Sequence, residues 1–281
     1  MKRLVQFLKY QLSVQLLRRR WILPLPVFLF LSYRAWNYLT APGIIPVPNP
    51  SASLNAWDML FVVFGNVFNV YFAICLLFMY LVSDLSPEND LGQQMLVRLK
   101  SRRLWWIGKT ATLLCLVIVF LLIAVSVVGI VSGITLPWGT EYSQQAQTSP
   151  ESLNLSMEFF RSVSPPAGPF GFLLIELAMI ALGLFSFGLV MLIINQLTGK
   201  YYIGLITIFA LIMLSYSAGF LSGQPNWTLY LPGRHLTFLD VLPVRLVPFE
   251  YSFLYWGIWI LITWVLGLFI SRRQNHYAIQ E

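Results

Sequence analysis

The chain has 281 residues, of which 58% are hydrophobic, 16% aromatic and only 10% charged, and its mean hydropathy is +0.72. Soluble domains carry about 25% charged residues, so this balance excludes a disordered chain and a disulfide-stapled secreted scaffold and predicts a single domain, residues 1–281, in a lipid bilayer. The net charge of +7 comes from basic residues that cluster beside apolar runs, which predicts topology signals rather than nucleic-acid binding.

The first twenty residues predict an amphipathic helix at the membrane surface. Leu4, Leu8, Leu12 and Leu16 recur at four-residue spacing, and basic residues and glutamines occupy much of the remaining surface of segment 2–20. A basic amphipathic helix that leads into a membrane span lies in the headgroup region. The alternative interpretation, a basic anchor that only sets topology, is compatible with this position.

Six stretches of the sequence are long and apolar enough to be membrane spans, since a span needs about 20 mostly apolar residues. The first contains two prolines and Arg34, which a membrane helix tolerates when the long side chain reaches the interface. We therefore predict an all-α membrane protein with six transmembrane helices. The spans are about 21–39, 57–82, 106–136, 170–197, 202–222 and 251–270.

The basic residues predict the orientation of these spans. Most lie before the first span, between the second and third, at Lys200 and at the C-terminal side of the last span, while the other side holds only Arg34, Arg161, Arg234 and Arg245. By the positive-inside rule both termini are cytoplasmic. The outer loops are then 40–56, 137–169 and 223–250, and the last is so apolar that we expect it at the outer interface or dipping inward as short half-helices.

The connection between the second and third spans is the longest on the cytoplasmic side. Ser86 is a good helix N-cap, Pro87 suits the first helical position, and Glu88 and Asp90 follow in the first turn. We therefore predict a helix within segment 84–103.

Leu91, Met95 and Leu99 form a narrow apolar stripe along this predicted helix. A short amphipathic helix held below the membrane suits docking in a groove of a partner protein. From the residues alone, a helix that folds back on the inner membrane face explains the pattern equally well.

With the six-span layout and the leading amphipathic helix, segment 84–109 resembles the membrane subunit of a type-2 ATP-binding-cassette exporter. In that family an acidic, glycine-containing segment follows the second span, and apolar residues, a Ser-Arg pair and a Gly-Lys pair lead into the third. The matching residues here are Glu88, Asp90, Gly92, Met95, Leu96, Ser101, Arg102, Gly108 and Lys109, while Leu99 stands where the family has a proline.

The resemblance implies that segment 84–103 is a coupling helix, which fits a cleft on a separate ATPase subunit that holds ATP and Mg, with no cofactor in this chain. It implies a second membrane subunit, an interfacial connecting helix at 2–20, re-entrant helices in loop 223–250 and a bacterial cytoplasmic membrane. The expected ATPase-docking residues are Glu88, Asp90, Leu91, Met95, Arg98, Leu99 and Arg102. Aromatic spans and sizeable outer loops favour an amphipathic or lipid-like cargo, for instance an antimicrobial peptide.

Three polar residues within the spans are candidates for the translocation path. Glu176 is the acidic residue deepest in a span, and an intramembrane carboxylate indicates a functional site unless it pairs structurally. Asn66 and Asn69 lie three residues apart on one helical face, where they would line a cavity or form interhelical hydrogen bonds. We expect His235 to be exposed, without metal-ligand spacing around it.

The sequence also bears on two other functional classes. An intramembrane hydrolase needs a nucleophile–base pair or a metal cluster at membrane depth, and the sequence has no His-Glu-x-x-His, no Gly-x-Ser-x-Gly and no histidine within a span, so we expect no catalytic or metal residues. A six-span scaffold or immunity protein that binds a toxin or lipid without ATP would have no need of a coupling helix.

Overall fold

The computed structural model describes residues 2–41, 54–86, 101–153, 157–218, 227, 230–237 and 249–273, and within these ranges every regular element is a helix. The predicted all-α class is confirmed for this part of the chain. The elements are α1 (Lys2–Leu16), η1 (Arg19–Ile22), α2 (Pro24–Thr40), α4 (Ala56–Gly65), the π-helix η2 (Asn69–Cys75), α5 (Leu76–Val82), η3 (Ser83–Leu85), α7 (Arg102–Thr135), α8 (Gln144–Thr148), η4 (Pro150–Leu153), α9 (Met157–Thr198), α10 (Tyr201–Ala218), η6 (Pro232–His235) and α11 (Phe249–Arg273).

Four of these helices are long and apolar enough to cross a membrane: α7, the part of α9 from Gly168 onward, α10 and α11. A fifth crossing results if α4 and the bent segment after it count as one span. Helix α2 has 17 residues. The predicted span at 21–39 is not among the four, and the six-span count stays a prediction.

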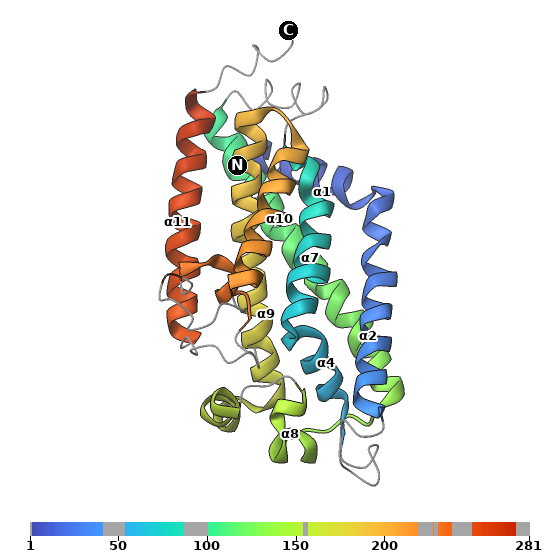
Figure 1. Ribbon diagram of the computed structural model, residues 1–281. Helices are drawn as coiled ribbons and strands as arrows, with labels where there is room; N and C mark the ends of the chain where they lie inside the picture. The colour runs from blue at the N-terminus through green and yellow to red at the C-terminus, as the bar shows by residue number, and fades with distance from the viewer. Residues whose placement is uncertain are drawn as a thin grey trace.

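Helices α7 and α9 form the centre of the bundle. Helix α7 crosses the bundle diagonally (Figure 1) and packs against α1, α2, α4, α9 and α11. Its 34 residues make it about 51 Å long, and a helix longer than the bilayer core accommodates by tilting. Helix α9 packs against α10 and α11 as well, so α7 and α9 together contact most of the other helices.

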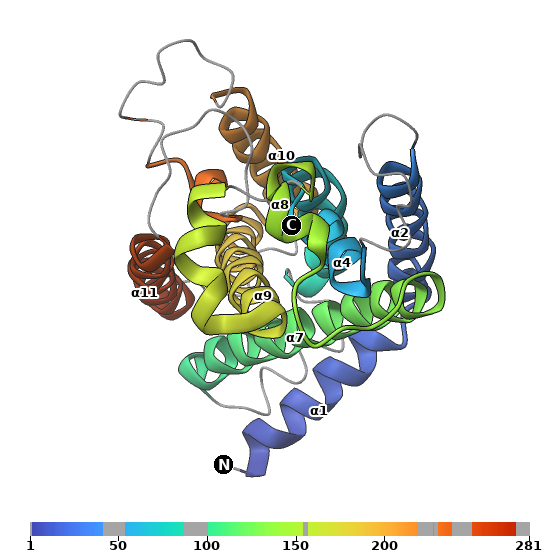
Figure 2. The same cartoon turned by 90° about the horizontal axis from the view of Figure 1, so that it is seen from below.

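The bundle has two opposite ends (Figure 1), which are named here by the helices that lie there. Helix α1, the start of α7 and the last turn of α11 share one end, because Phe7 packs on Gly108 and the Arg102 side chain bonds to the Arg272 carbonyl. We call this the α1 end, at the top of Figure 1, and the opposite one the α8 end. Figure 2, seen from the α8 end, shows α1 lying across α7 at the periphery of the bundle.

The second predicted span, 57–82, is not one straight helix. Helix α4 ends at Gly65, the backbone at Asn66 is extended, and the following helical segment leaves at 83°. Apolar composition cannot reveal such a break, because the residues on both sides of it are as hydrophobic as those of a continuous span. Helix α4 begins with a capping box, in which the Asp58 carboxylate accepts a hydrogen bond from the Asn55 N–H at 2.8 Å.

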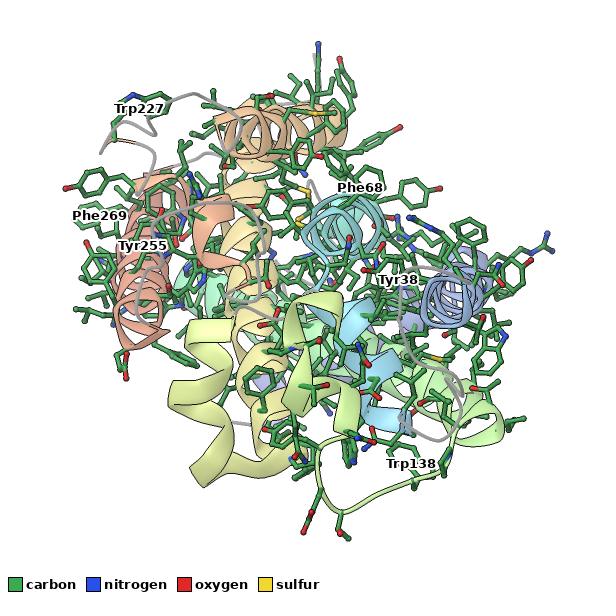
Figure 3. All side chains as sticks on the ribbon, turned by 60° about the horizontal axis from the view of Figure 1, so that its bottom comes forward. Tyr38, Phe68, Trp138, Trp227, Tyr255 and Phe269 are labelled. Carbon is green, nitrogen blue, oxygen red and sulfur yellow. The ribbon has the colours of Figure 1, made fainter. Side chains whose placement is uncertain are left out.

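At the α8 end, the connection after α7 covers the start of α4. The Trp57 Nε1–H donates to the Gly139 carbonyl at 2.7 Å, and the Ser143 hydroxyl donates to the Asp58 carboxylate at 2.8 Å. The predicted outer loop 137–169 thus contains α8, η4 and the first turns of α9. Trp138 lies at the edge of this end (Figure 3) and is 53% exposed.

Helix α1 ends at Leu16 rather than at residue 20, and its face toward the bundle is not the predicted leucine stripe. Phe7, Gln11 and Gln15 are 2%, 6% and 2% exposed, whereas the leucines are half-buried along its flank. These glutamines face inward because Gln11 meets the buried Lys109 and Gln15 meets the partly buried Arg20. A Cβ atom on Gly108 would lie 2.5 Å from the Phe7 ring, so only glycine permits this close approach.

We expect Gly108→Val to displace α1 from α7. Overpacking a tight contact costs about 1–3 kcal/mol, so trypsin should cleave the purified protein after Arg18–Arg20 at least about fivefold faster. Gly129→Val is the matched control, since a Cβ atom at Gly129 of the same helix meets nothing within 4 Å. Equal cleavage rates for the two variants would show that the Phe7–Gly108 contact does not hold α1.

Candidate functional site at the ends of segment 87–100

Most of the predicted docking residues lie outside the described part of the chain. Segment 87–100 contains Glu88, Asp90, Leu91, Met95, Arg98 and Leu99, so their predicted contacts stay predictions. The structure does describe the residues on both sides, η3 with Ser86 before the segment and Ser101 with α7 after it. These two ends decide how the segment is attached to the bundle.

The first attachment is ionic and joins η3 to the N-terminal helix. The Asp84 carboxylate forms ion pairs with Arg18 and Arg20. The Arg20 guanidinium also donates to the Gln15 side chain at 2.9 Å. Burial, together with the charge of Arg18, lowers the pKa of Arg20 to about 10, so the group remains charged at neutral pH and Asp84 is its counter-ion.

The second attachment is a lysine buried at the start of α7. Lys109 is 1% exposed, and its Nζ donates to the Leu85 carbonyl at 2.6 Å and to the Gln11 side chain at 3.3 Å. The same ammonium lies 5.9 Å from the centroid of the Trp105 ring. A buried charge persists only where such partners replace water. Lys109 therefore joins α1, η3 and α7 at one point.

The third attachment comes from the end of α9. The Asn195 side chain is fully buried, donates to the Ser83 carbonyl at 2.9 Å and accepts from the Gly204 N–H at 3.0 Å. Three consecutive residues of η3, Ser83 to Leu85, are thus bonded to α9, to the region of Arg18–Arg20 and to α7, respectively. We call this set of contacts the η3 anchor.

After the segment, α7 is attached to the last helix. Ser101 caps α7, with its hydroxyl accepting from the Leu104 N–H at 3.4 Å. Arg102 donates to the Arg272 carbonyl at 2.8 Å, which places a cation at the C-terminal end of α11 where it is favourable. The predicted role of Arg102 in docking an ATPase stays a prediction, and the contact shown here lies within the chain.

The described residues of the resemblance motif therefore share one location. Ser101 and Arg102 begin α7 and reach α11, Gly108 receives Phe7, and Lys109 bonds to Leu85 and Gln11. Each of them builds the α1 end of the bundle.

Asn66 and Asn69, predicted to line a cavity or to bond between helices, stabilise the bend after α4. The Asn69 amide donates to the Val63 carbonyl at 3.3 Å, and the Asn69 N–H donates to the Asn66 side chain at 3.1 Å. Asn69 is 7% exposed. These bonds supply partners for backbone groups that the break in the helix leaves without their usual ones.

Glu176, the third candidate for the path, is buried in α9 and only 1% exposed. It lies seven residues before Gly183, which at 3.6 residues per turn places both on the same face of α9. That face receives Leu236, next to η6, and Trp256 of α11, since a Cβ atom on Gly183 would meet both. The carboxylate therefore belongs to the interior side of α9, where η6 and α11 pack.

The expectation that His235 is exposed is wrong. His235 is fully buried, its Nδ1 lies 2.9 Å from the Ser252 hydroxyl, and its ring stacks on Tyr255 with centroids 3.9 Å apart. In addition, the Trp256 Nε1–H donates to the His235 carbonyl at 2.7 Å. A serine–histidine contact is one element of a serine hydrolase, and here both residues are buried, with Ser252 3% exposed.

Sequence reasoning also missed Asp84, Gln11 and Asn195 as members of the η3 anchor. The available signal was weak, namely single polar residues at the ends of apolar helices. The signal for His235 was stronger, because loop 223–250 was already too apolar to be solvated. Among the described residues, no group of three or more His, Cys, Asp or Glu side chains could hold a metal ion.

Comparisons with known protein families, with curated proteins and with solved structures find no match to this chain.

Replacing Asn195 tests the η3 anchor. In Asn195→Leu the Ser83 carbonyl and the Gly204 N–H lose their partners inside the bundle, and each unsatisfied buried group costs about 1–3 kcal/mol. We expect a lower midpoint of thermal unfolding, followed by tryptophan fluorescence in detergent. Asn37→Leu, at an exposed position of α2, is the control and should leave the midpoint unchanged. An unchanged midpoint for Asn195→Leu would contradict the anchor.

Proposed function

We propose that this chain is the permease subunit of an ATP-driven exporter of the type-2 ATP-binding-cassette class. The observation that supports the proposal best is the attachment of segment 87–100 to the bundle at both of its ends. The η3 anchor precedes the segment, and the Arg102–Arg272 bond follows it. A surface segment that receives force from a partner needs such attachments, whereas a passive connection between two spans does not.

The attachments specify which helices the segment would move. Displacement of its first end acts on Ser83–Leu85 and, through their bonds, on α1, α7 and α9. Displacement of its second end acts on α7 and, through Arg102, on α11. Because α7 extends from the α1 end to the α8 end, a tilt imposed at one end reaches the other. In this mechanism ATP binding by the partner is converted into a change at the outer side of the bundle.

The proposal includes the partners that the resemblance implies. A separate ATPase subunit holds ATP and Mg and receives Leu91, Met95 and Leu99 in a cleft, while Arg98 and Arg102 bind its acidic rim or phosphates of the inner leaflet. A second membrane subunit completes the path in the cytoplasmic membrane of a bacterium. The cargo is amphipathic or lipid-like, with an antimicrobial peptide as one example.

Docking of the ATPase is tested by Met95→Asp in the full chain. Burying an apolar side chain of this size contributes roughly 1.5–3 kcal/mol, and about 1.4 kcal/mol corresponds to a factor of ten. We expect at least tenfold weaker retention of the ATPase on affinity-purified permease, with normal amounts of the permease in the membrane. The control is Gln94→Ala on the polar face of the same predicted helix, which should retain the ATPase. If Met95→Asp keeps the ATPase and transport intact, segment 84–103 is a membrane-surface helix and the scaffold or immunity function becomes the better explanation.

Glu176→Gln tests whether the buried carboxylate takes part in transport. Keeping a carboxylate at membrane depth costs a few kcal/mol of insertion free energy, and a residue retained at that cost is a candidate for a functional role. Because glutamine has nearly the same shape, we expect normal assembly but altered transport or cargo-stimulated ATP hydrolysis. Glu141→Gln, at an exposed position near the α8 end, serves as the control. Unchanged transport in Glu176→Gln would assign the residue a purely structural role.

A further inference from the structure

Helix α1 has three different surfaces around its circumference. Phe7, Gln11 and Gln15 face the bundle and are almost completely buried. At 100° per residue the half-buried Leu8 and Leu12 lie along one flank. Val5, Lys9 and Ser13 are exposed on the side opposite the bundle. Since α1 lies across α7 at the periphery (Figure 2), this last side is uncovered.

The short helix η1 and the residues before it also have one side toward the bundle and one exposed side. Arg18 and Arg20 both pair with Asp84, so this carboxylate offsets one of their two positive charges within the bundle. Arg19, between them, is exposed. Around it Leu17 is 83% exposed and Ile22 is 62% exposed. The outer surface of α1 and η1 thus combines free cations with bare apolar side chains.

The charge of this surface is of one sign. No acidic residue precedes Asp58 in the sequence, so nothing within α1, η1 or α2 neutralises Lys9 or Arg19. Cations bordered by apolar side chains are complementary to an anionic bilayer surface, which offers phosphates above and acyl chains below. In water the apolar side chains of Leu17 and Ile22 would stay exposed, which is unfavourable in free energy. A soluble anion could bind the cations but would not cover these two side chains.

We propose that α1 and η1 bind anionic phospholipids of the inner leaflet. Lys9 and Arg19 contact the phosphates, while Leu17 and Ile22 enter the upper acyl region. The bound lipid stabilises the α1 end, because α1 is bonded to Lys109 through Gln11, and Arg18, between α1 and η1, pairs with Asp84. This interaction goes beyond the proposed transport function and requires no ATPase.

The experiment measures lipid binding by the full chain alone. Detergent-purified protein is titrated with phosphatidylglycerol or phosphatidylcholine, and bound lipid is counted by native mass spectrometry. Each basic residue near an anionic surface contributes about fivefold in affinity. Lys9→Gln/Arg19→Gln should therefore weaken phosphatidylglycerol binding about 25-fold and leave phosphatidylcholine binding unchanged.

Lys200→Gln/Arg272→Gln removes the same charge from two exposed positions outside α1 and η1 and should weaken phosphatidylglycerol binding clearly less than Lys9→Gln/Arg19→Gln. In nanodiscs, phosphatidylglycerol should raise the unfolding midpoint of the wild type but not that of Lys9→Gln/Arg19→Gln, and 0.5 M salt (about a 4 Å screening length) should reduce the difference. Equal binding of the two lipids by the wild type would overturn the inference. So would a Lys9→Gln/Arg19→Gln variant that still prefers phosphatidylglycerol. Because no partner is present, either result is independent of the outcome for the transport function.

Discussion

Backbone polar groups in a bilayer must find partners within the protein, since lipid offers none, and this constraint organises the structure. Several polar side chains of the described bundle bond to carbonyl groups at places where a helix ends or bends. The side-chain donors and the residues whose carbonyls accept from them are Lys109 and Leu85, Asn195 and Ser83, Arg102 and Arg272, Asn69 and Val63, and Trp256 and His235. In the described part of the chain, these five side chains therefore hold irregular points of the backbone in place.

The same constraint explains why short and bent elements exist inside this bundle. The 83° bend after α4 is tolerated because Asn66 and Asn69 supply the missing hydrogen bonds. The short η6 is held in the interior because His235 bonds to Ser252 and receives Trp256. Near the start of segment 87–100, a buried lysine and an ion-paired aspartate do the same for η3. A segment attached in this way moves together with the helices that hold it, which is the basis of the proposed coupling.

Close packing supplies the second source of stability, because helices in lipid gain little from the hydrophobic effect. Glycines allow large aromatic rings to approach the helix backbone. Phe7, which is 2% exposed, lies on Gly108, and the fully buried Trp106 lies on Gly267. Exposed rings have the opposite position, as Figure 3 shows for Phe269, which projects from the outer side of α11 and is 55% exposed. In the described part, aromatic residues thus act both as interior wedges and as outer surface.

The sequence by itself determined the all-helical class, the apolar helices of α7, α9, α10 and α11, and the basic, amphipathic character of α1. These properties follow from the local pattern of apolar and charged residues, which is readable along the chain. Only the tertiary structure decided that α4 and η2 are bent apart, that Gln11 and Gln15 face inward, that His235 is buried, and that Asp84, Lys109 and Asn195 converge on η3. The physical reason is that the energy of a buried polar group depends on its partner. Arg18 and Asp84 are 66 positions apart in the sequence (84 − 18), and Asn195 and Ser83 are 112 apart, so no local pattern brings them together.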